Sequence, residues 1–264
     1  MSPKILSSLP RPESSTSLLR ESPEIRPASP VPGVGSTLSR FFGRKKPARA
    51  SKHLPKRESF DRIRVNMLSR WLLQSGNECA VIAFASQARG GGVSTVVAGL
   101  ARSFGAADPG RVLVVDAAGN KRGVAHVLGT DSPPTATFRD LGRDEQDMLL
   151  WVEQAEGCGI DILPLADGGP LLPGSEEQAK ALLARLRPKY RLILIDAGAI
   201  AAGWALCWLT SSTYRILVID SNTATREILE HQHNEFQRNG LALDGFILNK
   251  RPYPIPRSLY WLAR

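Results

Sequence analysis

The sequence predicts an α/β fold, a mostly parallel sheet with helices on both faces, preceded by a disordered N-terminal tail. Three observations support this prediction. Short apolar runs alternate with stretches of helical periodicity from residue 58 onward, which is typical of parallel strands joined by helices. A glycine-rich segment follows the first apolar run and precedes a helical stretch. Residues 1–57, in contrast, are rich in proline, serine and arginine and lack periodic apolar residues.

The N-terminal tail, residues 1–57, is predicted to be disordered because it cannot bury enough apolar surface to offset its chain entropy. It holds all of the net charge of +9, so residues 58–264, predicted as one domain, are neutral overall. Two interpretations stay open for its basic second half. It is either a solvated linker or a docking segment for anionic lipid or an acidic partner. The candidate docking residues are Phe41, Phe42, Arg44, Lys45 and Lys46.

The elements of the domain follow from local periodicity in chain order. A helix is predicted first, because Phe60, Ile63 and Met67 recur at helical spacing. The predicted strands are Val81–Ala85, Val112–Val115, Ile160–Leu163, Leu192–Ile195, Tyr214–Ile219 and Gly245–Leu248. The predicted helices that follow are Thr95–Phe104, Glu176–Leu186 and Ala224–Arg238. Trp204 and Trp208 are four residues apart, which indicates a further helix face in the core or at an interface.

The glycine-rich segment Ser86–Thr95, S-Q-A-R-G-G-G-V-S-T, has the layout of a phosphate-binding P-loop. Its glycines let backbone N–H groups converge on a phosphate, and the end of the following helix adds a positive partial charge. Val93 stands where a P-loop has the lysine that reaches the terminal phosphates. The residues predicted to line a nucleotide site are Arg89, Gly90, Gly91, Gly92, Ser94 and Thr95.

Two aspartates end apolar strands, Asp116 in V-L-V-V-D and Asp196 in L-I-L-I-D. Ligands of parallel sheets bind at the carboxyl ends of the strands, where the glycine-rich segment also lies. Each aspartate alone has an alternative interpretation as a strand-end cap or an ion-pair partner. Together with the Ser94 hydroxyl they predict a magnesium site, and they are the only candidates for a catalytic role. The spacing of Cys79, Cys158 and Cys207 predicts neither disulfides nor a zinc site.

These ordered motifs resemble those of the bacterial tyrosine kinases, P-loop proteins of capsule and exopolysaccharide assembly within the wider group of MinD- and ParA-like ATPases. The resemblance covers residues 58–250. It implies a P-loop NTPase fold of the MinD/ParA type and an adenine contact from Asn249, after the last strand. It also implies that Glu58 and Arg64 lie on the helix that joins family members into a ring. The altered loop is similar, too, to that of the MinD-like protein of bacterial cellulose operons.

Several positions depart from the family pattern. The loop lysine is Val93, and Ala118 replaces the second acidic residue of the motif that begins at Asp116. Asp61 stands where the ring helix has an arginine, which disfavours a closed homo-octamer and leaves a monomer, a dimer or a mixed assembly. Losing the lysine removes a charge-assisted contact of about 1.5–3 kcal/mol. The loss is larger in the transition state, because phosphoryl transfer is catalysed mainly by positioning and electrostatics.

Three functions are weighed on this basis. The favoured one is a non-catalytic pseudo-ATPase or pseudokinase, a regulatory or scaffold subunit of bacterial exopolysaccharide synthesis or export that binds ATP or ADP with magnesium weakly. The second is a residual ATPase or tyrosine kinase that uses Arg89 or a lysine of a partner protein, and the third is a positioning ATPase of the MinD or ParA type. The resemblance implies a cytoplasmic protein at the inner membrane, partnered by a polysaccharide synthase or co-polymerase subunit. The neutral domain disfavours nucleic acid as a partner.

Overall fold

The computed structural model describes residues 57–72, 78–119, 123–130, 136–137, 151–155, 157–166 and 175–250. Within these ranges, seven strands form one sheet in the order β3-β4-β2-β5-β1-β6-β7. Neighbouring strands run parallel except for β3, which is antiparallel to β4. The strands are β1 (Ala80–Ser86), β2 (Val112–Asp116), β3 (Glu153–Ala155), β4 (Ile160–Pro164), β5 (Leu192–Ala199), β6 (Tyr214–Asp220) and β7 (Gly245–Asn249).

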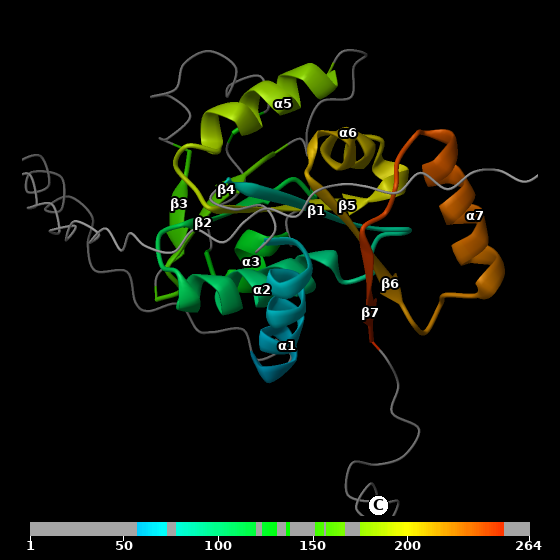
Figure 1. Ribbon diagram of the computed structural model, residues 1–264, viewed down its shortest axis with the longest axis horizontal. Helices are drawn as coiled ribbons and strands as arrows, with labels where there is room; N and C mark the ends of the chain where they lie inside the picture. The colour runs from blue at the N-terminus through cyan, green and yellow to red at the C-terminus, as the bar shows by residue number, and fades with distance from the viewer. Residues whose placement is uncertain are drawn as a thin grey trace, which may run out of the picture. The chain divides into compact units, whose positions relative to one another are not determined.

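Helices cover both faces of the sheet, so the predicted architecture is confirmed (Figure 1). One face carries α1 (Arg57–Met67), α2 (Val93–Ala107) and α3 (Val124–Leu128), and the other carries α5 (Ser175–Leu186), α6 (Trp204–Ser211) and α7 (Arg226–Arg238). A π-helical turn, Leu68–Leu72, continues α1, and a 3₁₀ turn, Ile200–Ala202, joins β5 to α6. All six predicted strands are present. The elements missed from the sequence are β3 and α3, which have three and five residues and are too short to show a period.

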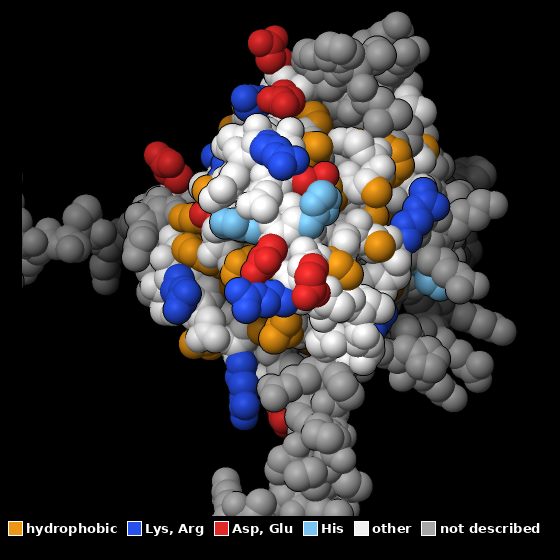
Figure 2. Space-filling view, turned by 90° about the vertical axis from the view of Figure 1, so that its right-hand side faces the viewer, with side chains coloured by type: hydrophobic (Ala, Val, Ile, Leu, Met, Phe, Trp, Pro, Cys, Tyr) orange, Lys and Arg blue, Asp and Glu red, His pale blue; other side chains and the backbone are white. Residues whose placement is uncertain are grey.

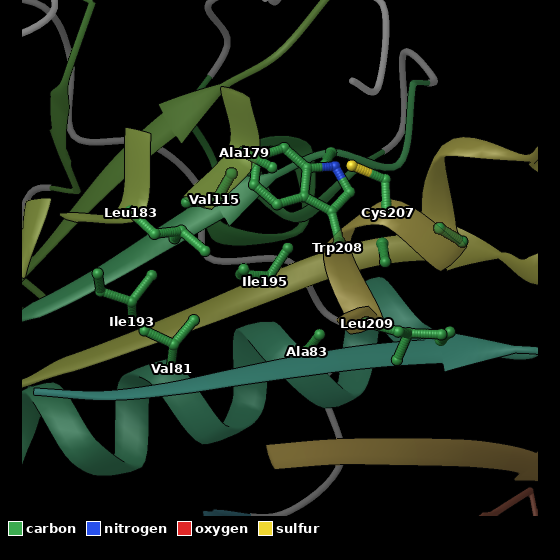
Figure 3. Packing of buried hydrophobic residues seen from close by; sticks show 14 of the residues in the cluster. Val81, Ala83, Val115, Ala179, Leu183, Ile193, Ile195, Cys207, Trp208 and Leu209 are labelled. Carbon is green, nitrogen blue, oxygen red and sulfur yellow. The ribbon is translucent and has the colours of Figure 1, made fainter. Parts of the chain in front are cut away.

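The core lies in two apolar layers, one on each face of the sheet. The central strands are buried on both faces, and β1 is buried at all seven positions, which explains its continuous apolar run. Trp208 of α6 is fully buried over β5, near Ile195 and Val115 (Figure 3). Burying a large apolar side chain contributes roughly 1.5–3 kcal/mol to folding. Trp208 therefore belongs to the core, and Trp204 is partly buried against it.

α1 packs closely on α2 through an aromatic contact and a polar chain. A Cβ atom at Gly99 would lie 2.3 Å from the ring of Phe60, so the ring sits directly on the backbone of α2. One turn further along α2, the Ser103 hydroxyl accepts a hydrogen bond from Arg64 Nε at 3.0 Å and donates one to Asp61 Oδ1. The Asp61 carboxylate and the Arg64 guanidinium thus share a partner on their own chain.

Candidate functional site

The candidate site lies where β1, β2 and β5 end. β1 finishes at Ser86 and α2 begins at Val93, so residues 87–92 form the turn between them, called here the glycine loop. α2 begins two residues earlier than the sequence predicted, which makes Val93 the first residue of the helix. Asp116, the last residue of β2, and Asp196 are register partners in paired strands, although β5 continues beyond Asp196 to Ala199 and is longer than the predicted strand. The predicted loop, acids and Ser94 are therefore brought to one edge of the sheet.

The glycine loop needs its glycines for conformation and for space. Gly90 and Gly92 have φ values of 85° and 89°, a region that side chains disfavour. A Cβ atom at Gly91 would lie 2.6 Å from the Cβ atom of Ser86. Gly92 caps α2 without a side-chain hydrogen bond. The N–H groups of the first helical turn have no partner within the helix, so this loop can present backbone donors to an anion.

Two residues at the end of β7 and directly after it donate hydrogen bonds to the glycine loop. Asn249 Nδ2 donates to the carbonyl oxygen of Gly91 at 3.0 Å, and Lys250 Nζ donates to that of Gly90 at 2.7 Å. Lys250 Nζ also lies 2.7 Å from Asp220 Oδ2, at the end of β6, and this hydrogen bond lowers the pKa of Asp220. Asn249, Lys250 and Asp220 are called here the β7 clamp. The side-chain amide of Asn249 is hydrogen-bonded to the glycine loop. The contact with adenine that was expected of Asn249 stays a prediction.

Lys250 and Asp220 were missed from the sequence. A signal for Asp220 was present, since it follows an apolar run at the end of β6, just as Asp116 and Asp196 follow apolar runs in the sequence. A cavity of about 390 Å³ opens beside the clamp, lined by residues of the glycine loop, the start of α7 and Lys250. Arg89 is exposed at the loop and lines the same cavity. The cations nearest to the loop within the described ranges are thus Arg89, at its surface, and Lys250, behind its carbonyl groups.

Val93 does not face the ligand side of the loop. Its side chain is 4% exposed and belongs to the apolar layer between α2 and the sheet. Ser94 and Thr95, the next two residues, are half-buried. An aliphatic side chain in this place stabilises the start of α2 and supplies no charge to a phosphate. The position that would carry a phosphate-binding lysine is therefore part of the core.

Two buried carboxyl groups form the other half of the site. Asp116 accepts hydrogen bonds from the backbone N–H of Ala125 at 3.0 Å and of Ala118 at 3.5 Å. Asp196 is fully buried, and its Oδ1 accepts from the N–H of Gly198 at 3.0 Å. Its Oδ2 is buried and accepts no hydrogen bond from the part of the chain that the structure describes.

Burial governs the protonation of this pair. It raises the pKa of Asp116, which the backbone N–H groups lower in part. Burial and then the charge of Asp116 raise the pKa of Asp196 to about 7. The Ser94 hydroxyl lies close enough to lower this pKa, although no ordinary hydrogen bond joins it to Oδ2. Two carboxylates that share a desolvated site favour either a proton or a cation between them.

These residues suit the metal ion of a magnesium nucleotide, but they lack the usual charged contact to its terminal phosphates. Two carboxylates, one of them with an unpartnered oxygen, and a hydroxyl are the hard oxygen donors that Mg²⁺ prefers. Ser94, Asp116 and Asp196 would hold the metal, and the helix N-terminus would meet the phosphates. The charge-assisted contact between a lysine and the phosphates is missing, because this position is Val93, whose side chain is buried in the core. In the described ranges, no cluster of three or more histidine, cysteine, aspartate or glutamate side chains offers another metal site.

The remaining predicted interaction residues divide into two groups. Glu58 is exposed on α1, and Arg64 is bonded to Ser103 of α2, so a role for both in self-association stays a prediction. Phe41, Phe42, Arg44, Lys45 and Lys46 lie outside the described residues. Of the helices that the structure describes, none has both the length and the apolar character needed to cross a bilayer.

Comparison with solved structures identifies the fold. The kinase domain of VpsO has a TM-score of 0.58 and 23% sequence identity, covering 74% of this chain and 96% of that one. The kinase domain of the Escherichia coli tyrosine kinase ETK has a TM-score of 0.60 and 21% identity, covering 76% and 78%. MinD from Pyrococcus horikoshii, a septum site-determining protein complexed with Mg-ADP, has a TM-score of 0.50 and 24% identity, covering 68% and 75%. No family model and no curated protein matches the sequence.

These structural neighbours are bacterial tyrosine kinase domains and a MinD protein, and the likeness establishes that the chain has their P-loop fold. At these identities the comparison extends to the fold alone. The function must be argued from the site.

Proposed function

We propose that this chain is a regulatory or scaffold subunit of bacterial exopolysaccharide synthesis or export, which binds a magnesium nucleotide weakly and does not transfer its phosphoryl group. The observation that carries the proposal is the burial of Val93 at the first position of α2. The resemblance of the ordered motifs to those of the bacterial tyrosine kinases supports the cellular role. The fold shared with the ETK kinase domain is consistent with it.

The site has some features of a phosphoryl-transfer site and lacks others. It has a glycine loop whose carbonyl oxygens accept hydrogen bonds from Asn249 and Lys250, and it has a pair of buried carboxyl groups. These features suit the binding of a metal and of phosphate oxygens to backbone donors. Val93 supplies no cation to the terminal phosphates, where charge develops during transfer, and Ala118 offers no second carboxylate in the strand-end motif. Such a site can respond to a nucleotide without consuming it.

A residual ATPase is the second candidate, and one observation favours it. Asp196 Oδ2 is buried without a partner, which suits a bound metal ion more than an empty core. Arg89 is exposed and adjoins Gly90, so it could reach a phosphate from the outer end of the loop. In this candidate Arg89 and the metal would together supply the charge that a lysine normally gives.

We propose further that the chain acts in the cytoplasm at the inner membrane, with a membrane synthase or co-polymerase subunit as its partner. The basic tail supports this proposal by its charge, since each basic residue near an anionic membrane contributes about 1 kcal/mol. The neutral domain does not provide such an attraction by itself, and the face drawn in Figure 2 carries acidic and basic side chains intermixed. The alternative, a tail that acts only as a solvated linker, gives no membrane binding.

The test is to measure nucleotide binding and turnover on the purified full chain. Titration calorimetry with Mg-ADP and Mg-ATP is expected to show weak binding that Asp196→Ala abolishes, and phosphate release is expected to match that of a boiled control. Phosphate release above this control that Asp196→Ala removes would favour the residual ATPase. In cells, loss of the chain should lower the amount of exported polysaccharide, and the Arg89→Ala variant should restore it if no phosphoryl transfer is needed.

A further inference from the structure

The outer edge of β7 is exposed and apolar. β7 ends the sheet and pairs only with β6 among the described strands. Phe246 and Leu248 are 64% and 63% exposed, and with Val65 of α1 they are the only large apolar side chains that the structure describes as exposed. Phe246 and Leu248 are two residues apart, so they project from the same face of the strand. Sheet edges are usually protected by charge, proline or cover, and this one has none of these on β7 itself.

The opposite face of β7 is also apolar. A groove of about 590 Å³ runs between α1 with its π-helical turn and the edge strand. Ile63, Met67, Trp71 and Ile247 contribute its apolar wall. A strand that paired with β7 would therefore place side chains beside Phe246 and Leu248 on one face, and on the other face beside this groove, which Asn66 and Arg70 also line. The exposed edge and the groove together favour an extended protein segment as the binding partner. Such a segment supplies backbone groups to pair with the edge and side chains to cover both faces.

The sequence of this edge is complementary to itself. Residues 244–250 are D-G-F-I-L-N-K. When this segment is paired antiparallel with a copy of itself about Ile247, Phe246 faces Leu248 of the second copy. Asp244 and Lys250 take no part in this pairing, because their side chains bond to Arg215 and Asp220 of β6, away from the free edge. The exposed apolar pair of β7 is therefore the part that is complementary to its own copy. An isologous contact needs this property, since each residue then finds its complement on an identical surface.

We propose that the edge of β7 binds a second copy of this chain, by antiparallel pairing of the two β7 strands around a two-fold axis at Ile247. Asp244 and Lys250 keep their partners on β6, Arg215 at 3.6 Å and Asp220 at 2.7 Å, and leave the contact to the backbone and apolar side chains of β7. β7 has five residues, so the contact is smaller than a standard interface of about 800 Å² per partner. The dimer is therefore weak and concentration-dependent. The inference does not depend on the proposed function, because no nucleotide contact enters it.

The test is sedimentation velocity on the full chain over a wide concentration range, with variants that change the charge pattern of the edge. In Phe246→Glu/Leu248→Glu, carboxylates face each other across the axis, and the dimer is expected to weaken at least tenfold. In the matched Phe246→Glu/Leu248→Lys variant, opposite charges face each other in this register, and the dimer is expected to persist and become sensitive to salt. The Val65→Glu variant, which changes the exposed apolar residue on α1, should leave the dimer intact.

Three outcomes of sedimentation and one of hydrogen exchange overturn the proposal. A wild-type chain that is monomeric at all concentrations has no such interface. Equal weakening by the two double variants shows that the antiparallel register is wrong, and weakening by Val65→Glu alone moves the contact to α1. Hydrogen exchange on residues 244–250 provides the remaining comparison. Protection that rises with protein concentration supports a second copy. Protection that is independent of concentration and is lost when residues 251–264 are deleted shows that the chain covers its own edge.

Discussion

Asn249, at the end of the last strand, donates from Nδ2 to the carbonyl oxygen of Gly91, in the loop that follows the first strand, at 3.0 Å. The two residues are 158 positions apart in the chain. The same amide nitrogen lies 2.0 Å from the place that a Cβ atom on Gly92 would occupy. The shape of the glycine loop therefore depends on a side chain from the far end of the domain, and the absence of a side chain at Gly92 makes room for it.

A double-mutant cycle should reveal this dependence. Gly92→Ala is expected to lower the free energy of unfolding by about 2–4 kcal/mol, from backbone strain at positive φ plus the clash with Asn249. Asn249→Ala alone should cost about 1 kcal/mol, the value of a typical hydrogen bond. In the Asn249→Ala background the cost of Gly92→Ala should fall by at least about 1 kcal/mol, as measured by urea denaturation.

Gly90→Ala is the matched control for this cycle. Gly90 has a similar φ of 85°, but no atom lies within 4 Å of the position of its missing Cβ. Its substitution should cost only the backbone strain of about 1–2 kcal/mol, and the cost should not change in the Asn249→Ala background. Additive costs for Gly92→Ala and Asn249→Ala would contradict the contact.

Restoring a lysine should strengthen nucleotide binding. Val93→Lys is expected to raise the affinity for Mg-ADP and Mg-ATP by about 10- to 100-fold, which corresponds to a charge-assisted contact of about 1.5–3 kcal/mol. It should also lower stability, because Val93 is 4% exposed in the core and the longer side chain must extend past it. Hydrolysis should remain low, because Ala118 still supplies no carboxylate. Calorimetric titration measures the affinity.

Val93→Met separates charge from size in this experiment. Methionine is long and flexible but uncharged, so it should lower stability without raising the affinity. An equal gain in affinity from Val93→Met and Val93→Lys would show that the effect is one of packing and not of charge.

The buried acid pair should make stability depend on pH. The pKa of Asp196 is raised from 3.8 to about 7 in the folded chain, so its neutral form is stabilised by folding. The stability from this group is fully present below pH 3.8 and is lost as the pH rises through 7. The melting temperature should therefore fall between about pH 5.5 and pH 8, and Mg²⁺ should restore it at pH 8. Asp196→Asn should flatten the pH profile and abolish the effect of Mg²⁺.

Asp108→Asn is a suitable control for the acid pair. Asp108 forms an exposed ion pair with Arg191 at 3.9 Å, so its replacement should change stability by less than about 1 kcal/mol and leave the Mg²⁺ effect intact. A Mg²⁺ effect that persists in Asp196→Asn would place the metal elsewhere.

The proposed role of the tail predicts a change in membrane binding. Deleting residues 1–56, up to the start of α1, should leave a folded domain with a net charge of +1 that no longer sediments with anionic vesicles. Replacing Arg44, Lys45 and Lys46 by glutamine in the full chain should weaken binding by about 3 kcal/mol, whereas replacing Phe41 and Phe42 by serine tests insertion separately. Co-sedimentation at low and high salt is the measurement. Equal binding by the full and truncated chains would show that the tail is a solvated linker.

The sequence predicted the fold and the place of the site because both depend on local patterns. Apolar runs between helical stretches define parallel strands, and Asp116 and Asp196 end two of these runs, so they had to lie at one edge of the sheet. The β7 clamp could not be predicted in the same way. Lys250 meets Gly90 across 160 positions of sequence, and no local period encodes such a contact. The burial of the Val93 side chain could not be predicted either, since α2 begins two residues earlier than its apolar pattern suggested.

β7 has a free edge along its length and holds the glycine loop at its end, so the two proposed binding events of this chain share one strand. Thermodynamic linkage then applies between them. If pairing at the edge changes the position of Asn249 relative to Gly91, it changes the affinity of the loop for its anion by some factor. A ligand on the loop must then change the affinity of the edge by the same factor. A chain without turnover could in this way convert the level of a nucleotide into its own state of assembly.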